Sequence, residues 1–161
     1  MNNALMFSKA TDEWSTPQDF FDALDVEFNL DLDAAATREN RKCNWYLNYN
    51  DDALEVDWVG YIRARIEAFD HVAVWLNPPY SKCREFIAKA AQEASKGCTV
   101  VCLVPSRTDT RWWHEHVWDA TQHRPRPGVE VRFVKGRLKF GGATAGAPFP
   151  SVVIVFRPVE S

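Results

Sequence analysis

Hydrophobic and polar positions follow two different periods along the chain, and the two periods alternate. Apolar runs predict strands at residues 71–76, 99–104 and 151–156, and the second run is of the kind that is buried on both faces of a sheet. Residues 18–28 and 83–95 instead space their apolar side chains three and four positions apart, as an amphipathic helix does. Because helices and strands alternate, the pattern favours an α/β fold with a mostly parallel central sheet flanked by helices.

Weaker patterns predict the remaining elements. Strands are expected at 30–33, around 45–47 and at 129–134, helices at 58–69 and 111–120, a turn that begins at 34–36, and a glycine-rich loop at 136–150. No repeat or linker divides the 161 residues. We therefore expect residues 1–161 to form one compact domain, in which residues 1–10 could be disordered.

Charge is unevenly spread along the chain. The net charge of −3 and the sequence pI of about 5.8 exclude a generally basic protein. Residues 11–57 nevertheless carry 13 acidic and 3 basic side chains, whereas residues 124–139 carry six basic side chains and one acidic one. A basic segment around a strand and a glycine-rich loop indicates contact with nucleic acid.

Composition also bears on location and on metals. No apolar run reaches the ~18–20 residues of a membrane span, and the first residues lack the layout of a signal peptide. The four cysteines show neither a C-x-x-C pair nor a histidine at metal-ligand spacing. We therefore expect a cytoplasmic protein with reduced thiols, no metal and no membrane partner.

The predicted strand at 71–76 ends at Asn77-Pro78-Pro79-Tyr80, at the edge where α/β sheets bind their ligands. The two prolines stop the strand and remove two backbone donors, so the carbonyl groups there have no neighbouring N–H to compete for their partners. Asn77 and the Pro78 carbonyl supply two acceptors, and Tyr80 supplies a flat face with a polar tip. This set suits a planar group that carries an NH2.

The Asn-Pro-Pro-Tyr motif after a strand resembles the catalytic motif of amino-methyltransferases that use S-adenosylmethionine. Five further blocks agree in order with one compact group of these enzymes. They are DEWSTP at 12–17, DLDAAA at 31–36 with DDAL at 51–54, LVPSRTDTRWWHEHV at 103–117, VRFVKGRLKFGG at 131–142 and APFPSVVIVF at 147–156. Together they resemble the phage-type (Dam-like) DNA N6-adenine methyltransferases over residues 11–156.

The resemblance implies a Rossmann-like methyltransferase fold, S-adenosylmethionine as cofactor and double-stranded DNA as partner. The methyl group would go to the N6 amine of an adenine that has left the duplex. The catalytic residues it implies are Asn77, Pro78 and Tyr80. The cofactor contacts it implies are Trp14, Thr16, Pro17, Asp31, Asp33, Ala34, Asp52, Ala53 and Asn77.

Two of these assignments are more specific than the rest. Asp33 is favoured over Asp31 for the cofactor's ammonium group, and Asp52 would accept a hydrogen bond from the cofactor's adenine. The chain departs from most methyltransferases of this fold because Ala34-Ala35-Ala36 stands where they have a glycine-rich turn. No residue is identified for the cofactor's ribose.

The length leaves no room for a separate target-recognition domain, so we expect loops 106–115 and 136–150 to recognise DNA. The residues expected to contact DNA are Arg107, Arg111, Trp112, Lys135, Arg137 and Lys139. The protein would be a monomer or a homodimer, in the cytoplasm of the bacterial host if a phage encodes it.

Two other interpretations stay open. The same motif occurs in methyltransferases of RNA bases and of protein glutamine; the basic, aromatic C-terminal third disfavours glutamine but does not separate DNA from RNA. A non-catalytic DNA-binding module of the same fold is the other interpretation. The intact Asn77, Pro78 and Tyr80 argue against it, and the missing glycines argue weakly for it.

Overall fold

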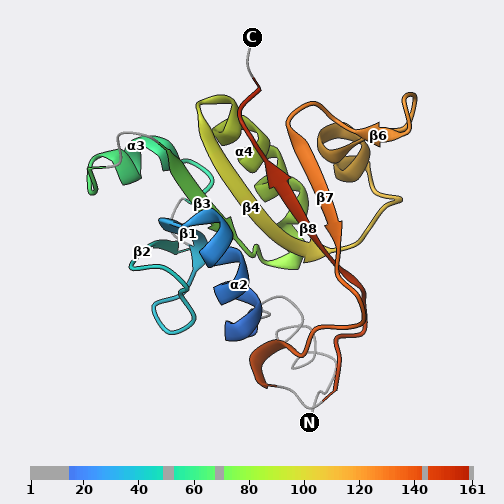
Figure 1. Ribbon diagram of the computed structural model, residues 1–161, viewed down its shortest axis with the longest axis horizontal. Helices are drawn as coiled ribbons and strands as arrows, with labels where there is room; N and C mark the ends of the chain where they lie inside the picture. The colour runs from blue at the N-terminus through green and yellow to red at the C-terminus, as the bar shows by residue number, and fades with distance from the viewer. Residues whose placement is uncertain (1–14, 49–52, 68–70, 143–144, 160–161) are drawn as a thin grey trace.

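Six strands form one central sheet in this computed structural model, which describes residues 15–48, 53–67, 71–142 and 145–159. The order across the sheet is β2-β1-β3-β4-β8-β7 (Figure 1). The strands are β1 (Leu32–Ala36), β2 (Trp45–Asn48), β3 (Val72–Leu76), β4 (Cys98–Pro105), β7 (Val129–Phe133) and β8 (Ser151–Phe156). The pairs β1–β2, β1–β3 and β3–β4 are parallel, and β8 runs antiparallel to both of its neighbours. The predicted α/β fold with a mostly parallel sheet is confirmed.

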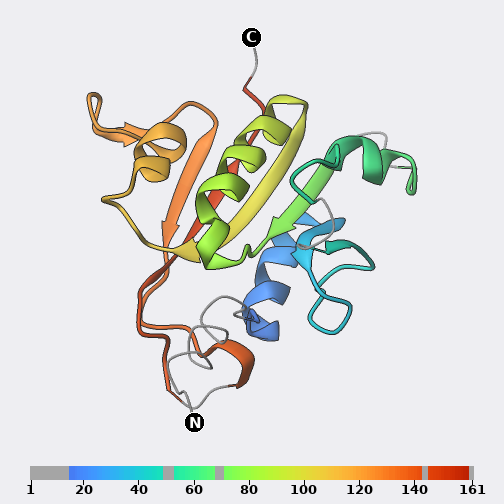
Figure 2. The same ribbon diagram turned by 180° about the vertical axis from the view of Figure 1, so that it is seen from behind.

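Helical layers cover both faces of this sheet. On one face, α3 (Trp58–Arg63), α4 (Cys83–Ser95) and the π-helical turn η2 (Trp113–Val117) share a core with β3, β4 and β8. On the other face, α2 (Gln18–Phe28) and the loop that precedes β8 pack over a second core that contains Trp75 and Val101. The helix α2 lies in front of the sheet in Figure 1, and α4 lies in front of it in Figure 2.

Local signals set the ends of the two longest helices. The helix α2 begins directly after Pro17 and ends where Asn29 adopts a left-handed φ of 52°. The helix α4 turns an apolar stripe toward the sheet and ends before Gly97, whose φ of +112° suits glycine alone. Both helices have the ranges that their apolar spacing predicts.

Three expectations about elements are wrong. The strand β1 continues to Ala36, so the three alanines form its carboxyl end and not a turn; all its residues are buried between the two helical layers, where small side chains fit. The helix α3 ends at Arg63 and does not run to residue 69. Residues 111–120 are not one helix, because Trp118 leaves helical geometry and β5 (Trp118–Asp119) pairs with β6 (Arg124–Pro125).

The strand order reverses direction between β1 and β3. From β1 the chain moves outward to β2 on one side and then returns to β3 on the other side. Because β1, β3 and β4 are parallel, their carboxyl ends meet at one edge of the sheet, which we call the carboxyl edge. Open α/β sheets bind ligands at this edge, beside the point of reversal. The loop between β7 and β8 also extends from it (Figures 1 and 2).

Candidate functional site

Asn77 directly follows β3, beside the point where the strand order reverses. Its Nδ2 donates a hydrogen bond of 3.1 Å to Oγ1 of Thr16, a residue that is only 4% exposed. Because the carboxamide nitrogen faces Thr16, the carboxamide oxygen is directed away from Thr16, and this oxygen is itself buried. Pro78 and Pro79 are buried next to it. The structure thus brings together two residues that the sequence analysis assigned to the site, and it fixes the orientation of the amide.

Tyr80 begins the short turn η1 (Tyr80–Lys82), which leads from the prolines into α4. Its ring meets Phe149 edge to face, with ring centroids 5.2 Å apart, and Phe149 lies 6.0 Å from Phe140. The phenol oxygen is buried without a hydrogen-bond partner among the described residues. Burial raises the pKa of Tyr80 well above its ordinary value. Tyr80 is therefore a neutral ring that the loop before β8 holds in place.

The segment before α2 lies between the Asn77 motif and that same loop. The backbone N–H of Gly141 donates to Ser15 O at 3.0 Å, and Thr16, the next residue, contacts Asn77. Pro17 is partly buried where α2 begins. Trp14, which the sequence analysis placed at the cofactor, is outside the described residues. The N-terminal segment thus links the two structures that flank the carboxyl edge.

The two candidate aspartates lie in and before β1, and neither is at its carboxyl end. Asp33 is 3% exposed; its Oδ1 accepts from Ala35 N at 3.3 Å and its Oδ2 from Lys42 N at 2.9 Å. Burial raises the pKa of Asp33 to about 6 in spite of these bonds. Asp31 precedes the strand, where it accepts a bond from Ala73 N, and burial raises its pKa as well. Asp33 is therefore the candidate nearer the carboxyl edge.

Small side chains form the carboxyl end of β1. Ala34, Ala35 and Ala36 are all buried. A tight turn follows, in which Thr37 N donates to Asn40 Oδ1 at 2.7 Å and Asn40 N donates to Thr37 Oγ1 at 3.2 Å. Alanine has the smallest side chain after glycine, so among the other residues it restricts the approach of a ligand to the backbone least. The carboxyl end of β1 thus carries three buried methyl side chains and nothing larger.

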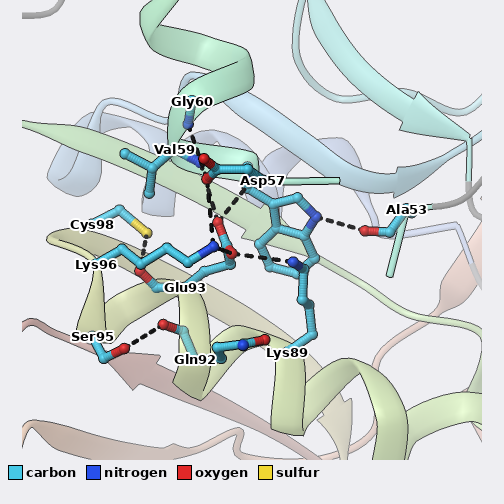
Figure 3. Close-up of polar contacts among 11 residues, drawn as sticks. Ala53, Asp57, Val59, Gly60, Lys89, Gln92, Glu93, Ser95, Lys96 and Cys98 are labelled. Atoms are coloured by element: carbon cyan, nitrogen blue, oxygen red, sulfur yellow. Dashed lines mark hydrogen bonds and ion pairs between the residues drawn. The ribbon is translucent and has the colours of Figure 1, made fainter. Parts of the chain in front are cut away.

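A buried carboxylate that the sequence analysis did not single out organises the start of α3 (Figure 3). Glu93 of α4 is 0% exposed, and its Oε1 accepts from Trp58 N at 2.8 Å and from Val59 N at 3.2 Å. Its Oε2 pairs with Lys89 Nζ at 3.1 Å and with Lys96 Nζ at 2.7 Å. Helix starts leave backbone N–H donors without partners, and the Glu93 carboxylate accepts hydrogen bonds from two such donors of α3.

Asp57 completes this cap and Trp58 extends it toward the site. Asp57 Oδ1 accepts from Gly60 N at 3.1 Å, and a Cβ at residue 60 would lie 2.6 Å from the other oxygen of Asp57, so a larger residue there would displace the Asp57 carboxylate. Trp58 Nε1 donates to the carbonyl of Ala53 at 2.8 Å. Glu93 of α4 thus holds Trp58 of α3, and Trp58 in turn holds the carbonyl of Ala53, a candidate cofactor residue. Its neighbour Asp52 is outside the described residues.

The position of Glu93 in the sequence carried a signal. It lies on the same face of α4 as Phe86, Ala90 and Ala94, because residues three and four apart share a helix face. A charged residue on an apolar stripe needs partners. Those partners could not be named from the sequence, because Trp58 and Val59 lie far from Glu93 in the chain.

The candidate DNA contacts differ in exposure. The five basic side chains among them are exposed, at Arg107, Arg111, Lys135, Arg137 and Lys139. Trp112, in contrast, is only 6% exposed and belongs to the core between the sheet and α4. The prediction that Trp112 offers a stacking surface to DNA is therefore wrong, because its ring is used for packing.

Two searches of the described residues found nothing. No group of His, Cys, Asp and Glu side chains in these ranges could hold a metal ion. Among the same residues, no helix is both long and apolar enough to cross a membrane. All four cysteines are free and buried.

Comparisons with known proteins identify the family of this chain. The chain is 32% identical over 105 residues to a DNA N-6-adenine-methyltransferase of Escherichia phage T1, which is 65% of this chain and 40% of the phage protein. It is 27% identical over 150 residues to a DNA N-6-adenine-methyltransferase of Haemophilus phage HP1, which is 91% of this chain and 79% of that protein. No solved structure matches. The family model of DNA N-6-adenine-methyltransferase (Dam) matches residues 4–161, so the chain belongs to the Dam family of DNA N6-adenine methyltransferases.

Proposed function

We propose that this chain transfers a methyl group from S-adenosylmethionine to the N6 amine of adenine in DNA. Membership of the Dam family supports the reaction. The observation that carries the assignment to a site is the bond from Asn77 Nδ2 to Thr16 Oγ1, beside the reversal of the strand order. It fixes the orientation of the Asn77 carboxamide, whose buried oxygen is a hydrogen-bond acceptor at the edge where an α/β sheet binds its ligand.

The strand order also supports the finer proposal of a Rossmann-like methyltransferase fold. The arrangement β2-β1-β3-β4 has the reversal of doubly wound sheets that bind nucleotide cofactors, and the antiparallel β8 is inserted between β4 and β7. A nucleotide-like cofactor would then lie over the carboxyl ends of β1 and β3.

The described residues at this edge fit S-adenosylmethionine. Its amino-acid part needs acceptors for an ammonium group. Thr16 would supply a hydroxyl oxygen beside Asn77, and Asp33 would supply a buried carboxylate three residues before the carboxyl end of β1. Ala34 places only a methyl group on the backbone of β1, and Pro17 borders the same edge. The carbonyl of Ala53 is held by Trp58 and would serve the adenine end. When bound, the cofactor supplies an electrophilic methyl group on a sulfonium.

Asn77 and Pro78 would activate the target amine. The amine of adenine is a poor nucleophile because its lone pair is delocalised into the ring. The carboxamide oxygen of Asn77 and the carbonyl of Pro78 would accept its two hydrogens, which favours a pyramidal nitrogen with a free lone pair. Acceptors that are fixed before the reaction need no reorganisation during it. Asn77 is neutral and serves as an acceptor, not as a base.

Tyr80 would hold the base in the pocket. The amine cannot reach a donor inside the duplex, so the adenine must leave the base stack. The ring of Tyr80 offers a face for stacking, and its contact with Phe149 fixes the plane of that face. A phenol is uncharged near neutral pH, and burial raises the pKa of Tyr80 further, so the ring brings no negative charge against the base.

Double-stranded DNA is the proposed partner, bound by a monomer or a homodimer in the cytoplasm of a phage host. The exposed Arg107, Arg111, Lys135, Arg137 and Lys139 follow β4 and β7 and so lie near the carboxyl edge. Lys and Arg at such positions contact phosphates and orient the duplex without reading its sequence.

The test is methyl transfer from tritiated S-adenosylmethionine to unmethylated duplex DNA, followed by digestion to nucleosides. We expect the label in N6-methyladenine. Label in methylcytosine, label only when RNA is supplied, or label in a glutamine-containing protein would each contradict the proposal and select another substrate. A chain that binds DNA and transfers no label would be a binding module.

The substitution Asn77→Ala tests the mechanism. Removing one fixed polar contact of this kind lowers kcat about 100- to 1000-fold. We expect that loss in kcat, with the Kd for S-adenosylmethionine within a few-fold of wild type by calorimetry. The companion Thr16→Val removes the hydroxyl that orients Asn77 and that would also face the cofactor's ammonium group, so it should lower kcat less than Asn77→Ala does and weaken cofactor binding. Wild-type turnover in Asn77→Ala would exclude the proposed role.

A further inference from the structure

Phe133 is an apolar ring that the proposed reaction leaves unused. It is 67% exposed, and the other exposed large apolar side chains of the described residues are Val26, Trp45 and Val159. Trp45 begins β2, so it lies at the amino end of a parallel strand, and Val26 is within α2. Phe133 is the last residue of β7. It is therefore the exposed aromatic side chain that lies at the carboxyl edge.

The register of the sheet places Phe133 relative to the site. Phe133 pairs with Val152 on β8, and Val152 pairs with Val104 on β4. Neighbouring strands lie about 4.8 Å apart, so Phe133 is roughly 10 Å across the sheet from Val104. Two residues beyond Val104 the chain enters the segment with the exposed Arg107. Phe133 thus lies in the same row of the sheet as the residues that lead into one candidate DNA loop.

Phe133 also opens the other candidate loop. The side chains of Phe133, Lys135, Arg137 and Lys139 are all exposed, and we call these four residues the 133–139 ridge. Between them, Val134 and Leu138 pack against the core on the α2 side of the sheet, and Phe140 is buried in it. The packed positions anchor the segment while the ridge faces solvent. One aromatic ring and three cations are the composition that single-stranded or opened nucleic acid requires.

The anchoring of the loop is visible in its cross-contacts. Ala147 N donates to Leu138 O at 2.8 Å, and Arg137 donates to the carbonyl of Ala147 at 3.2 Å. A Cβ at Gly146 would lie 2.6 Å from the Cβ of Arg137. The segment that follows β7 and the segment that precedes β8, which we call the two limbs of the loop, can therefore approach this closely only with glycine at residue 146. In both ribbon views the limbs run side by side (Figures 1 and 2). The ridge is therefore presented by a braced segment.

Charge singles out the same surface. Arg132, next to Phe133, is neutralised because it forms ion pairs with Glu27 and Glu130. The residues from 131 to 159 include five basic side chains and no acidic one. The exposed cations of the ridge suit a polyanion, and a ring among them suits a polyanion that also has planar faces. DNA combines the two features.

We propose that Phe133 stacks against the bases that border the target adenine after that adenine has left the duplex, while Lys135, Arg137 and Lys139 hold the adjacent phosphates. The inference rests on the proposed function, which requires the adenine to leave the stack. Extrusion opens a step in the duplex, and apolar side chains occupy such steps in proteins that distort DNA. Stacking on a base is tolerant of sequence, because every base has a π-face.

The test compares Phe133→Ala with Phe133→Tyr, and uses Val159→Ala as the matched control for an exposed apolar side chain elsewhere. Binding to a fluorescent unmethylated duplex is measured by anisotropy over a range of salt concentrations. We expect Phe133→Ala to weaken binding about 10-fold with an unchanged salt slope, because no charge is removed. Phe133→Tyr keeps a ring and should bind within about twofold of wild type, as should Val159→Ala.

Several outcomes would overturn the inference. They are wild-type binding by Phe133→Ala, an equal loss in Phe133→Tyr, an equal loss in Val159→Ala, or no binding of duplex DNA by the wild-type chain. The readout is binding and not turnover, so failure of the inference is distinct from failure of the function. If wild type methylates DNA and Phe133→Ala binds normally, only the inference is wrong. If the variant loses binding and wild type transfers no methyl group, Phe133 contacts DNA but the proposed function is wrong, and with it the part of the inference that concerns a target adenine.

Discussion

Asn77 and Thr16 show how single residues define this site. Asn77 could be predicted from the sequence, because an apolar strand that ends in two prolines is a local signal. Its partner could not, since Thr16 lies 61 positions away and reads locally only as a residue before a helix. The prediction that Trp112 stacks on DNA was wrong for a related reason. A tryptophan beside arginines could stack on DNA or pack inside, and only its 6% exposure in the folded chain decides.

Asp33 leads to a prediction about pH. Its pKa rises from 3.8 to about 6 on folding, so the folded protein holds this proton more tightly than the unfolded chain does. Its contribution to the free energy of unfolding is therefore largest below the ordinary pKa and falls as the pH rises through about 6. A shift of this size corresponds to about 3 kcal/mol.

The substitution Asp33→Asn removes the titration. We expect wild type to gain up to about 3 kcal/mol in unfolding free energy relative to Asp33→Asn as the pH falls from 8 to 4, because only wild type takes up the proton. Urea unfolding of both proteins across that range measures the difference. Other carboxylates titrate in both proteins and cancel. A difference that stays constant with pH would mean that Asp33 titrates as it does in the unfolded chain.

At the scale of elements, the helices and strands that could be predicted are those set by neighbouring residues in the sequence. The elements that were missed depend on contacts with distant parts of the chain. The helices at 18–28 and 83–95 were predictable because neighbouring residues in the sequence determine both their apolar spacing and their ends. The end of β1 was not, because alanine has no marked strand preference and its extension depends on burial between two helical layers. The β5–β6 pair was missed because each strand has only two residues.

The cap of α3 by Glu93 belongs to this scale, because one side chain of α4 positions another helix. We expect Glu93→Gln to lower the free energy of unfolding by about 3 kcal/mol, since breaking a buried ion pair leaves a buried charge, here that of Lys89, without its partner. The amide oxygen of glutamine can still accept from Trp58 and Val59, so the fold should persist. Urea unfolding monitored by tryptophan fluorescence measures the loss.

Lys96→Gln is the matched control for this prediction. Lys96 contacts the same carboxylate oxygen, but its side chain is 40% exposed, and exposed pairs contribute only about 0–1 kcal/mol. A loss in Lys96→Gln as large as that in Glu93→Gln would contradict the account based on burial. Combining Lys89→Met with Glu93→Gln should recover part of the stability, because the buried cation is then absent.

At the scale of the whole molecule, a chain of net charge −3 must bind a polyanion through a local surface. Charges further apart than about 10 Å are largely screened at physiological salt, so acidic residues remote from that surface oppose DNA only weakly. The exposed cations after β4 and β7 lie near one edge of the sheet, the edge that also holds Asn77. Association of DNA should therefore depend on those few cations.

The double substitution Arg137→Gln with Lys139→Gln tests this dependence. Each phosphate contact contributes about 0.9 to the slope of log Kobs against log salt, so the variant should lose about 2 from the slope and bind DNA more weakly at low salt. Arg124→Gln with Arg157→Gln changes the net charge equally but alters residues at β6 and after β8, away from the loop, and should keep the wild-type slope. Anisotropy titrations from low to physiological salt measure all three proteins. If both double variants lost the same amount from the salt slope of wild type, net charge and not the loop would govern binding.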